Sequence, residues 1–165
     1  MPKAVIEKLN VVHPAAPKIY LALRLGSVYN HSSKVYHAED PIKEIDTVLA
    51  KLGFVHFAKF GKSISDTKLS KYLNNNPFYL VVIHKLTGEY TSKVYKIVSY
   101  SREMPADTKS YPKYYRGKEG LVGVWFKLEA TEDQVDIEQL RVSSSYQKLR
   151  QAMGSSMASF FFCKT

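Results

Sequence analysis

The sequence predicts a mixed α/β or α+β domain built on one curled β-sheet, and three observations support this prediction. Several strand-length segments are apolar or alternate with period two, and other segments repeat their apolar residues at helical spacing. The order of these segments is β-α-β-α-β-β-β-α-β, which is typical of a mixed sheet. The chain has 165 residues, of which 45% are hydrophobic. This length suits a single domain, 1–165, with one good core.

A helix is expected over residues 40–53. Asp40 is a candidate N-cap, Pro41 suits the first helical position, and Gly53 is a natural stop. The apolar residues between them recur at helical spacing and predict one buried face: Ile42, Ile45, Val48, Leu49 and Leu52.

The other elements follow from shorter patterns. Alternation and apolar runs predict strands over 18–25, 54–60, 78–86, 89–99, 120–128 and 157–163. The Thr87-Gly88 pair predicts a hairpin between the strands expected over 78–86 and 89–99. Helical spacing predicts a short helix over 65–73 opened by Ser65, a turn or helix over 134–141, and a helix over 145–153. Residues 101–118 have little periodicity and predict a long loop, and such loops in small domains are usually functional.

Tyrosine and positive charge are concentrated in the same stretches. The chain has 12 tyrosines and a formal net charge of +9, and the tyrosines cluster with basic residues and serine at 27–37, 89–96 and 111–118. Cations bind phosphates and aromatic faces stack on unpaired bases, so this combination predicts nucleic-acid binding. The alternative interpretation is that tyrosine packs half-buried on strands. Residues 119–140 are acidic, so we expect one basic and one acidic face.

The sequence carries no signature of a membrane-spanning protein or an enzyme. No apolar run approaches the ~20 residues that a membrane span needs. There is no phosphate-binding loop, no histidine pair at metal-binding spacing, and no cluster of carboxylates that would hold magnesium. Cys163 is the single cysteine and is expected to be a buried, inert thiol, and His84 is expected to be a core histidine. We therefore expect a non-catalytic, cytoplasmic domain with no cofactor or metal.

Three further motifs resemble known families. A strand at 19–25 leads into His31-Ser32-Ser33-Lys34-Val35-Tyr36-His37, a hairpin spans 79–94, and a glycine-strand-tryptophan segment spans 117–126. Over residues 18–163 this pattern is similar to the YTH and EVE families, which share a PUA-like fold. The resemblance implies an α+β, PUA-like domain in which a curled mixed β-sheet or barrel is flanked by helices. YTH cages are built from tryptophans, whereas Trp125 matches a structural tryptophan, and this departure favours the EVE branch.

The resemblance also implies a pocket for a base. The two aromatic walls of the family's cage correspond to Tyr36 and Tyr90. Ser27 and the backbone near Gly26 and His37 would offer hydrogen bonds to the edge of the flipped base. The expected ligands of the nucleic-acid backbone are basic residues of the first strand, of the tyrosine-rich stretches and of the long loop: Arg24, Lys34, Lys93, Lys96, Arg102, Lys113, Arg116 and Lys118.

Taken further, the resemblance implies a function in DNA modification-dependent restriction. Among EVE-like modules the chain looks most like the N-terminal DNA-reading domain of archaeal McrB-type restriction subunits. Its expected partner is methylated duplex DNA, with N6-methyladenine flipped into the pocket, together with further domains and subunits of a restriction complex. Because the chain ends directly after an apolar run, we expect it to be cut from a longer protein. The alternatives are an RNA-binding PUA-like module and a protein-interaction domain that uses the acidic residues 129–138.

Overall fold

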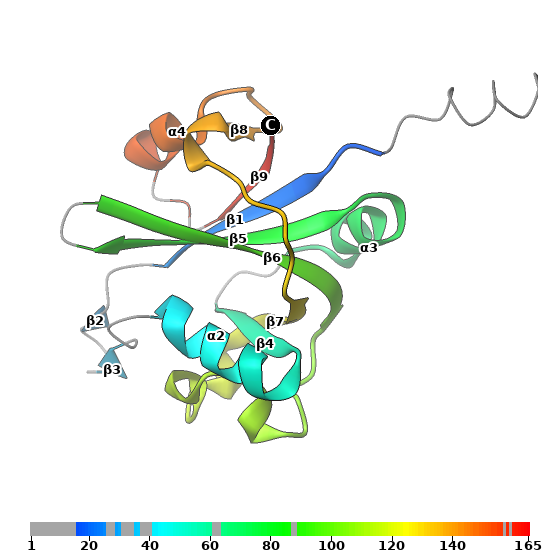
Figure 1. Ribbon diagram of the computed structural model, residues 1–165, viewed down its shortest axis with the longest axis vertical. Coiled ribbons are helices and arrows are strands. Elements are labelled where there is room, and N and C mark those ends of the chain that lie inside the picture. Colours follow the sequence, from blue (N-terminus) through cyan, green and yellow to red (C-terminus); the bar gives the residue numbers. More distant parts are fainter. Residues whose placement is uncertain are drawn as a thin grey trace, which may run out of the picture.

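The computed structural model shows a seven-stranded mixed sheet and three α-helices among the residues described (Figure 1). These residues are 16–25, 29–30, 35–36, 41–60, 64–86, 89–156, 158 and 160–165. For 29–30, 35–36, 85–86 and 114 the description covers the backbone alone. None of the helices described combines the length and apolar character needed to cross a membrane.

The sheet runs in the order β4-β7-β6-β5-β1-β9-β8. Its strands are β1 (Ile19–Leu25), β4 (Val55–Phe60), β5 (Phe78–Leu86), β6 (Glu89–Ser101), β7 (Val122–Glu129), β8 (Arg141–Val142) and β9 (Phe160–Lys164). Strands β1 and β5 are parallel, and all other neighbours are antiparallel. Two short strands, β2 (Tyr29–Asn30) and β3 (Val35–Tyr36), form a separate hairpin that the sequence patterns did not predict.

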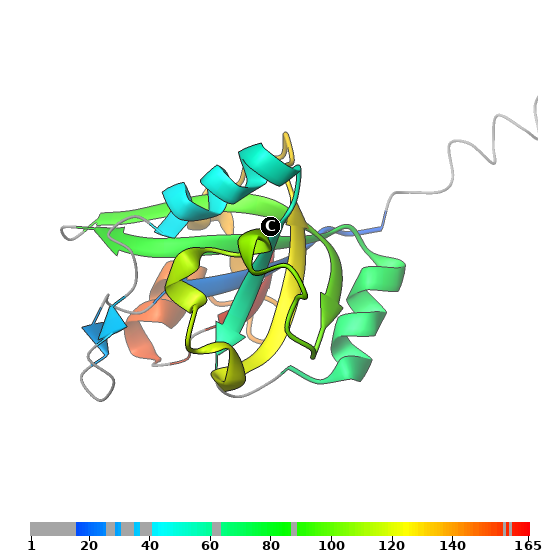
Figure 2. The same ribbon diagram turned by 90° about the horizontal axis from the view of Figure 1, so that it is seen from below.

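The fold class is therefore α+β, as the sequence predicts. The sheet is strongly twisted in both views (Figures 1 and 2). The strands described form an open order with β4 and β8 at its two edges, so the expectation of a closed barrel is wrong. The curled mixed sheet flanked by helices is the form that the structure supports.

Helices α2 (Pro41–Leu52) and α3 (Asp66–Asn75) cover one face of the sheet. Their buried residues Ile45 and Leu69 pack on the largest core cluster, which also contains Phe57 and Phe126. Both helices follow the predicted local signals. Gly53 has a φ of +79°, and its N–H donates to Leu49 O at 2.8 Å, which ends α2. The Ser65 side chain accepts from the N–H of Lys68 and caps α3.

The opposite face is covered by α4 (Leu149–Ser155) and the 3-10 turn η4 (Ile137–Gln139). The helix expected over 145–153 begins later, because Tyr146 has a φ of +59° and its N–H closes a turn onto Val142 O. It also continues through Gly154, which does not break it. Cys163 is fully buried in this cluster, and burial raises the pKa of its thiol to about 12, so the prediction of a buried thiol is confirmed.

The long loop between β6 and β7 packs on the outer face of β4 and β7. It contains three 3-10 turns, η1 (Thr108–Ser110), η2 (Lys113–Tyr115) and η3 (Glu119–Leu121). Tyr111 and Tyr115 from the loop form a small core with Ala58 and Trp125 from the sheet. Trp125 is 2% exposed, and its ring centroid lies 4.9 Å from that of Tyr111. The predictions that Trp125 and His84 are buried core residues are confirmed.

Candidate nucleic-acid interface

A cleft of about 570 Å³ lies between α2 and the turns η1 and η2 of the long loop. Both ribbon views place α2 beside these turns (Figures 1 and 2). We call it the basic cleft, and its lining residues come from two segments that are far apart in the sequence: Lys43, Glu44, Thr47, Val48, Lys51 and Leu52 from α2, and Lys109, Tyr111, Pro112, Lys113 and Arg116 from the loop.

The α2 wall of the basic cleft follows from the geometry of the helix. Side chains four residues apart stack along one side of a helix. Lys43, Thr47 and Lys51 therefore form one row, and Glu44, Val48 and Leu52 form the adjacent row, nearer the core. The outer row is polar and exposed, whereas Val48 is half-buried. The same amphipathic helix therefore packs one face against the core and carries Lys43 and Lys51 on its exposed side.

The loop wall is held in place by hydrogen bonds at three points. Arg102 anchors the start of the loop, because its guanidinium donates to the Asp66 carboxylate and to the carbonyls of Ile64 and Gly123. The hydroxyl of Tyr111 donates to Glu119 Oε2 at 2.8 Å, which ties the end of η1 to the start of η3. The pKa of Glu119 is accordingly lowered, first by backbone hydrogen bonds and then by that of Tyr111.

The third point joins the loop to strand β4 through a histidine. Nδ1 of His56 lies 2.8 Å from Ser110 Oγ, and this hydroxyl donates to the carbonyl of Asp107 at 2.7 Å. The hydroxyl proton is therefore engaged, so Ser110 Oγ accepts a hydrogen bond from Nδ1–H of His56. Burial, followed by the charge of Lys127, lowers the pKa of His56. Ser110 is 1% exposed, so this pair positions the loop and is not an accessible nucleophile with its base.

Positive charge dominates the basic cleft. Its described lining contains five cationic side chains, Lys43, Lys51, Lys109, Lys113 and Arg116, and the single carboxylate of Glu44. All five cations are exposed. Lys51, Lys109, Lys113 and Arg116 form no ion pair with any residue that the structure describes. Such side chains can approach an incoming anion without first breaking an internal pair.

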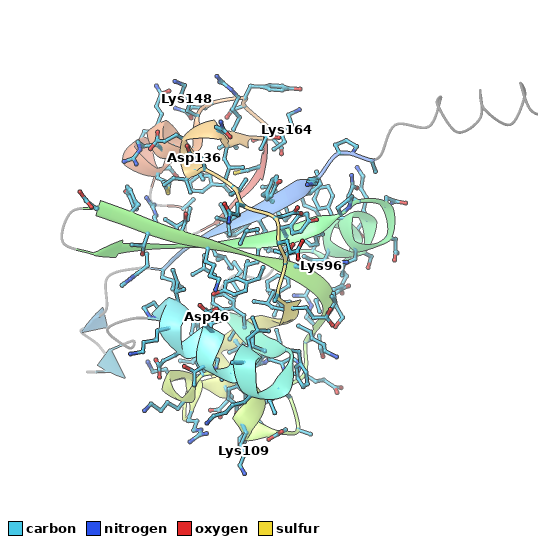
Figure 3. All side chains as sticks on the ribbon, in the orientation of Figure 1. Asp46, Lys96, Lys109, Asp136, Lys148 and Lys164 are labelled. Atoms are coloured by element: carbon cyan, nitrogen blue, oxygen red, sulfur yellow. The ribbon has the colours of Figure 1, made fainter. Side chains whose placement is uncertain are left out.

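Two of the predicted phosphate ligands, Lys113 and Arg116, line this cleft. Lys118 is half-buried and does not belong to its described lining. Lys93 instead pairs with Asp46 at 2.7 Å. Lys96 lies on a different part of the surface from Lys109 (Figure 3). Its charge is one of the smaller contributions that lower the pKa of Asp133.

The two predicted arginines outside this cleft have internal roles. The guanidinium of Arg24 donates to the carbonyls of Met153, Ser156 and Ala158, where α4 ends and the chain leads into β9. Arg102 anchors the loop, as described above. Lys34 lies outside the described residues.

The predicted base pocket falls mainly outside the described part of the chain. Gly26, Ser27 and His37 are not described, and for Tyr36 only the backbone in β3 is described. Tyr90 is half-buried at the start of β6, with the Arg150 guanidinium 5.2 Å from its ring centroid. The pairing of Tyr36 with Tyr90 around a base therefore stays a prediction.

The residues named from the sequence leave out three cations of the basic cleft, Lys43, Lys51 and Lys109, of which Lys109 belongs to the long loop that was expected to contact phosphate. The first two could have been found from the predicted helix, because their spacing of eight residues places them on one side of it. Nothing in the sequence shows that Lys109 faces that helix, since this depends on how the loop folds over β4 and β7.

Glu119 of the acidic segment is hydrogen-bonded to Tyr111 in the cleft lining, whereas Asp136 lies far from the basic cleft. Asp136 and Lys109 are at opposite ends of the molecule (Figure 3). Within the segment, Asp133 pairs with Lys18 at 3.3 Å, and Glu138 pairs with Arg150. Lys148 and Lys164 lie at the same end as Asp136 (Figure 3), so the expectation of a separate acidic face stays a prediction.

Comparison with protein-family models, curated proteins and solved structures yields no match to this chain. Among the described residues there is also no group of three or more histidine, cysteine, aspartate or glutamate side chains that could hold a metal ion.

Proposed function

We propose that this domain is a non-catalytic nucleic-acid-binding module and that the basic cleft is where it binds the phosphate backbone. The observation that carries the proposal is the set of five exposed cations on two facing walls of one cleft. Phosphate contacts of this kind release counterions, and this release supplies most of the affinity of a nucleic-acid-binding protein. They fix the position of the strand but carry no sequence information.

For the ligand, we propose DNA that contains a modified base, with N6-methyladenine as the first candidate. The support is the resemblance to the YTH and EVE families; the structure itself bears on the α+β class alone, with an open, mixed seven-stranded sheet. A methyl group on a base is read most effectively when the base is extruded, because stacking and edge hydrogen bonds then offset the unstacking cost of a few kcal/mol. A domain of this kind would direct a restriction complex to its target.

Fluorescence anisotropy with labelled oligonucleotides tests this function. The panel contains methylated duplex, unmethylated duplex and RNA of the same length, each titrated at several salt concentrations. If each of the five cations neutralises one phosphate, log Kobs should fall with log salt at a slope of about −4.5 for duplex and about −3.5 for a single strand. Binding that does not change with salt would contradict the proposal. Preference for RNA would assign the domain to the RNA-binding alternative.

A further inference from the structure

The basic cleft has an apolar floor between its charged walls. Leu52 is 39% exposed, which makes it one of the few large hydrophobic side chains that the described surface leaves open. It is the last residue of α2, and Val48 lies one helical turn before it on the same side. Pro112 faces them from the loop. One exposed leucine carries little meaning, but here it adjoins other apolar groups inside a cleft.

This floor is backed by rigid structure. Tyr111, next to Pro112, is 1% exposed, donates its hydroxyl to Glu119, and packs edge-on against Trp125. Pro112 is itself buried and has few conformations available. The apolar surface is therefore in place before a ligand binds, so a flat ligand that packs on it loses little free energy to ordering of the protein.

The cations also extend along the whole length of the basic cleft. Lys43 and Lys51 are eight residues apart on α2, which separates them by about 12 Å along the helix axis, and Lys109, Lys113 and Arg116 stand on the facing wall. A single compact anion would need cations at one point only. A chain of phosphates that enters at one end and leaves at the other uses them all.

We infer that the basic cleft takes one unpaired nucleotide, with its base on the floor formed by Val48, Leu52 and Pro112 and its flanking phosphates on the lysines of the two walls. This inference rests on the proposed function and adds where an unpaired base is held. A volume of about 570 Å³ lies in the range of small-molecule pockets. The faces of a paired base are covered by its neighbours, so the nucleotide must come from a single strand or be extruded from a duplex. Cations predominate on both walls, with Glu44 as the single carboxylate, and the flat apolar floor between them suits a base with its flanking phosphates better than an acidic peptide.

The test compares an intact single-stranded oligonucleotide with an abasic strand of the same length, which keeps the phosphates and lacks the bases. We expect the intact strand to bind roughly tenfold more tightly, because the base covers apolar surface of the floor and burial of about 60 Å² gives a factor of this size. Leu52→Asn should remove most of this advantage while leaving affinity for the abasic strand unchanged, which also shows that the variant is folded. Leu121→Asn is the matched control, because Leu121 is 68% exposed and lies outside the cleft, and it should behave as wild type. Lys109→Ala should weaken the binding of the intact and the abasic strand by the same factor.

Several outcomes would overturn the inference. Equal affinity for intact and abasic strands would show that phosphates alone are bound, which leaves the proposed function intact. If the wild-type protein binds neither strand, the proposed function is contradicted as well.

Two duplexes, one fully paired and one with a mismatch, identify the source of the unpaired base. Tighter binding of the mismatched duplex than of the paired one would identify an extruded base, and tighter binding of the single strand than of both duplexes would identify single-strand binding. If a fully paired duplex binds as tightly as the single strand and the mismatched duplex, the cleft does not need an unpaired base, and the inference is contradicted. Displacement of the intact strand by an equimolar acidic peptide would assign the cleft to a protein.

Discussion

At the scale of single residues, His56 couples the long loop to pH. Its pKa is lowered in the folded protein, chiefly by burial, so protonation favours the unfolded chain. When the pKa of a histidine is lower in the folded protein, the free energy of unfolding is at its full value above the pKa of the unfolded chain, about 6.5. It decreases as the pH falls below that pKa. Protonation at Nε2 keeps the Nδ1–H donor to Ser110, but it places a charge in a partly buried site beside Lys127, and this destabilises the folded state around the loop.

We therefore predict that the melting temperature of the wild type falls between pH 7.5 and pH 5.5 by more than that of His56→Gln. Glutamine keeps a donor for Ser110 but does not titrate. The carboxylates with lowered pKa values, such as Glu119 and Asp133, titrate below this window and are shared by both proteins. Parallel melting curves for the two proteins across this range would show that His56 does not couple the loop to pH.

At the scale of elements, the long loop depends on one buried side chain of the sheet. Trp125 contacts both Tyr111 and Tyr115, with ring centroids 4.9 Å and 5.9 Å away. Truncation of a buried tryptophan to alanine costs about 3–5 kcal/mol, and each kcal/mol lowers the melting temperature of a domain of this size by about 2–4 °C.

Trp125→Ala should therefore lower the melting temperature by roughly 10 °C and weaken nucleic-acid binding, because the loop wall of the basic cleft packs on this residue. Trp125→Phe, which keeps an aromatic ring against Tyr111, should recover much of both properties. Calorimetry and anisotropy measure the two effects. A variant with unchanged stability would mean that Trp125 does not support the loop.

Most elements could be predicted because their signals are local. Gly53 ends α2 through its own backbone conformation, and Ser65 caps α3 with its own side chain. The start of α4 could not be predicted, because it depends on a turn at Tyr146. The backbone of Tyr146 is left-handed, and its carbonyl accepts a hydrogen bond from the guanidinium of Arg141. The apolar spacing of Tyr146, Leu149 and Met153 fits a helix, and a turn fixed by tertiary contacts replaces its first part.

At the scale of the whole molecule, the candidate site was only partly visible in the sequence. Lys113 and Arg116 were expected to bind phosphate, and they lie in the basic cleft. Arg24 and Arg102 have the same chemistry, yet their guanidinium groups bind carbonyls of the protein itself. Sequence shows that a cation is present, whereas its partners depend on how distant segments fold together.

The arrangement of charge over the molecule allows a direct test of the basic cleft as the nucleic-acid interface. Lys109 and Lys148 lie at opposite ends (Figure 3), and Lys113 and Lys71 are exposed cations inside and outside the basic cleft. The double variants Lys109→Glu/Lys113→Glu and Lys71→Glu/Lys148→Glu therefore have the same net charge and differ only in where the charge is reversed.

The decisive measurement is the affinity of both variants for a labelled oligonucleotide, by anisotropy at low and moderate salt. We expect the variant reversed inside the basic cleft to bind at least tenfold more weakly than the variant reversed outside it. Its salt slope should also be less steep by about 1.4 to 1.8, as expected from the loss of two phosphate contacts. Equal affinities and equal slopes for the two variants would contradict the assignment of this cleft as the nucleic-acid interface.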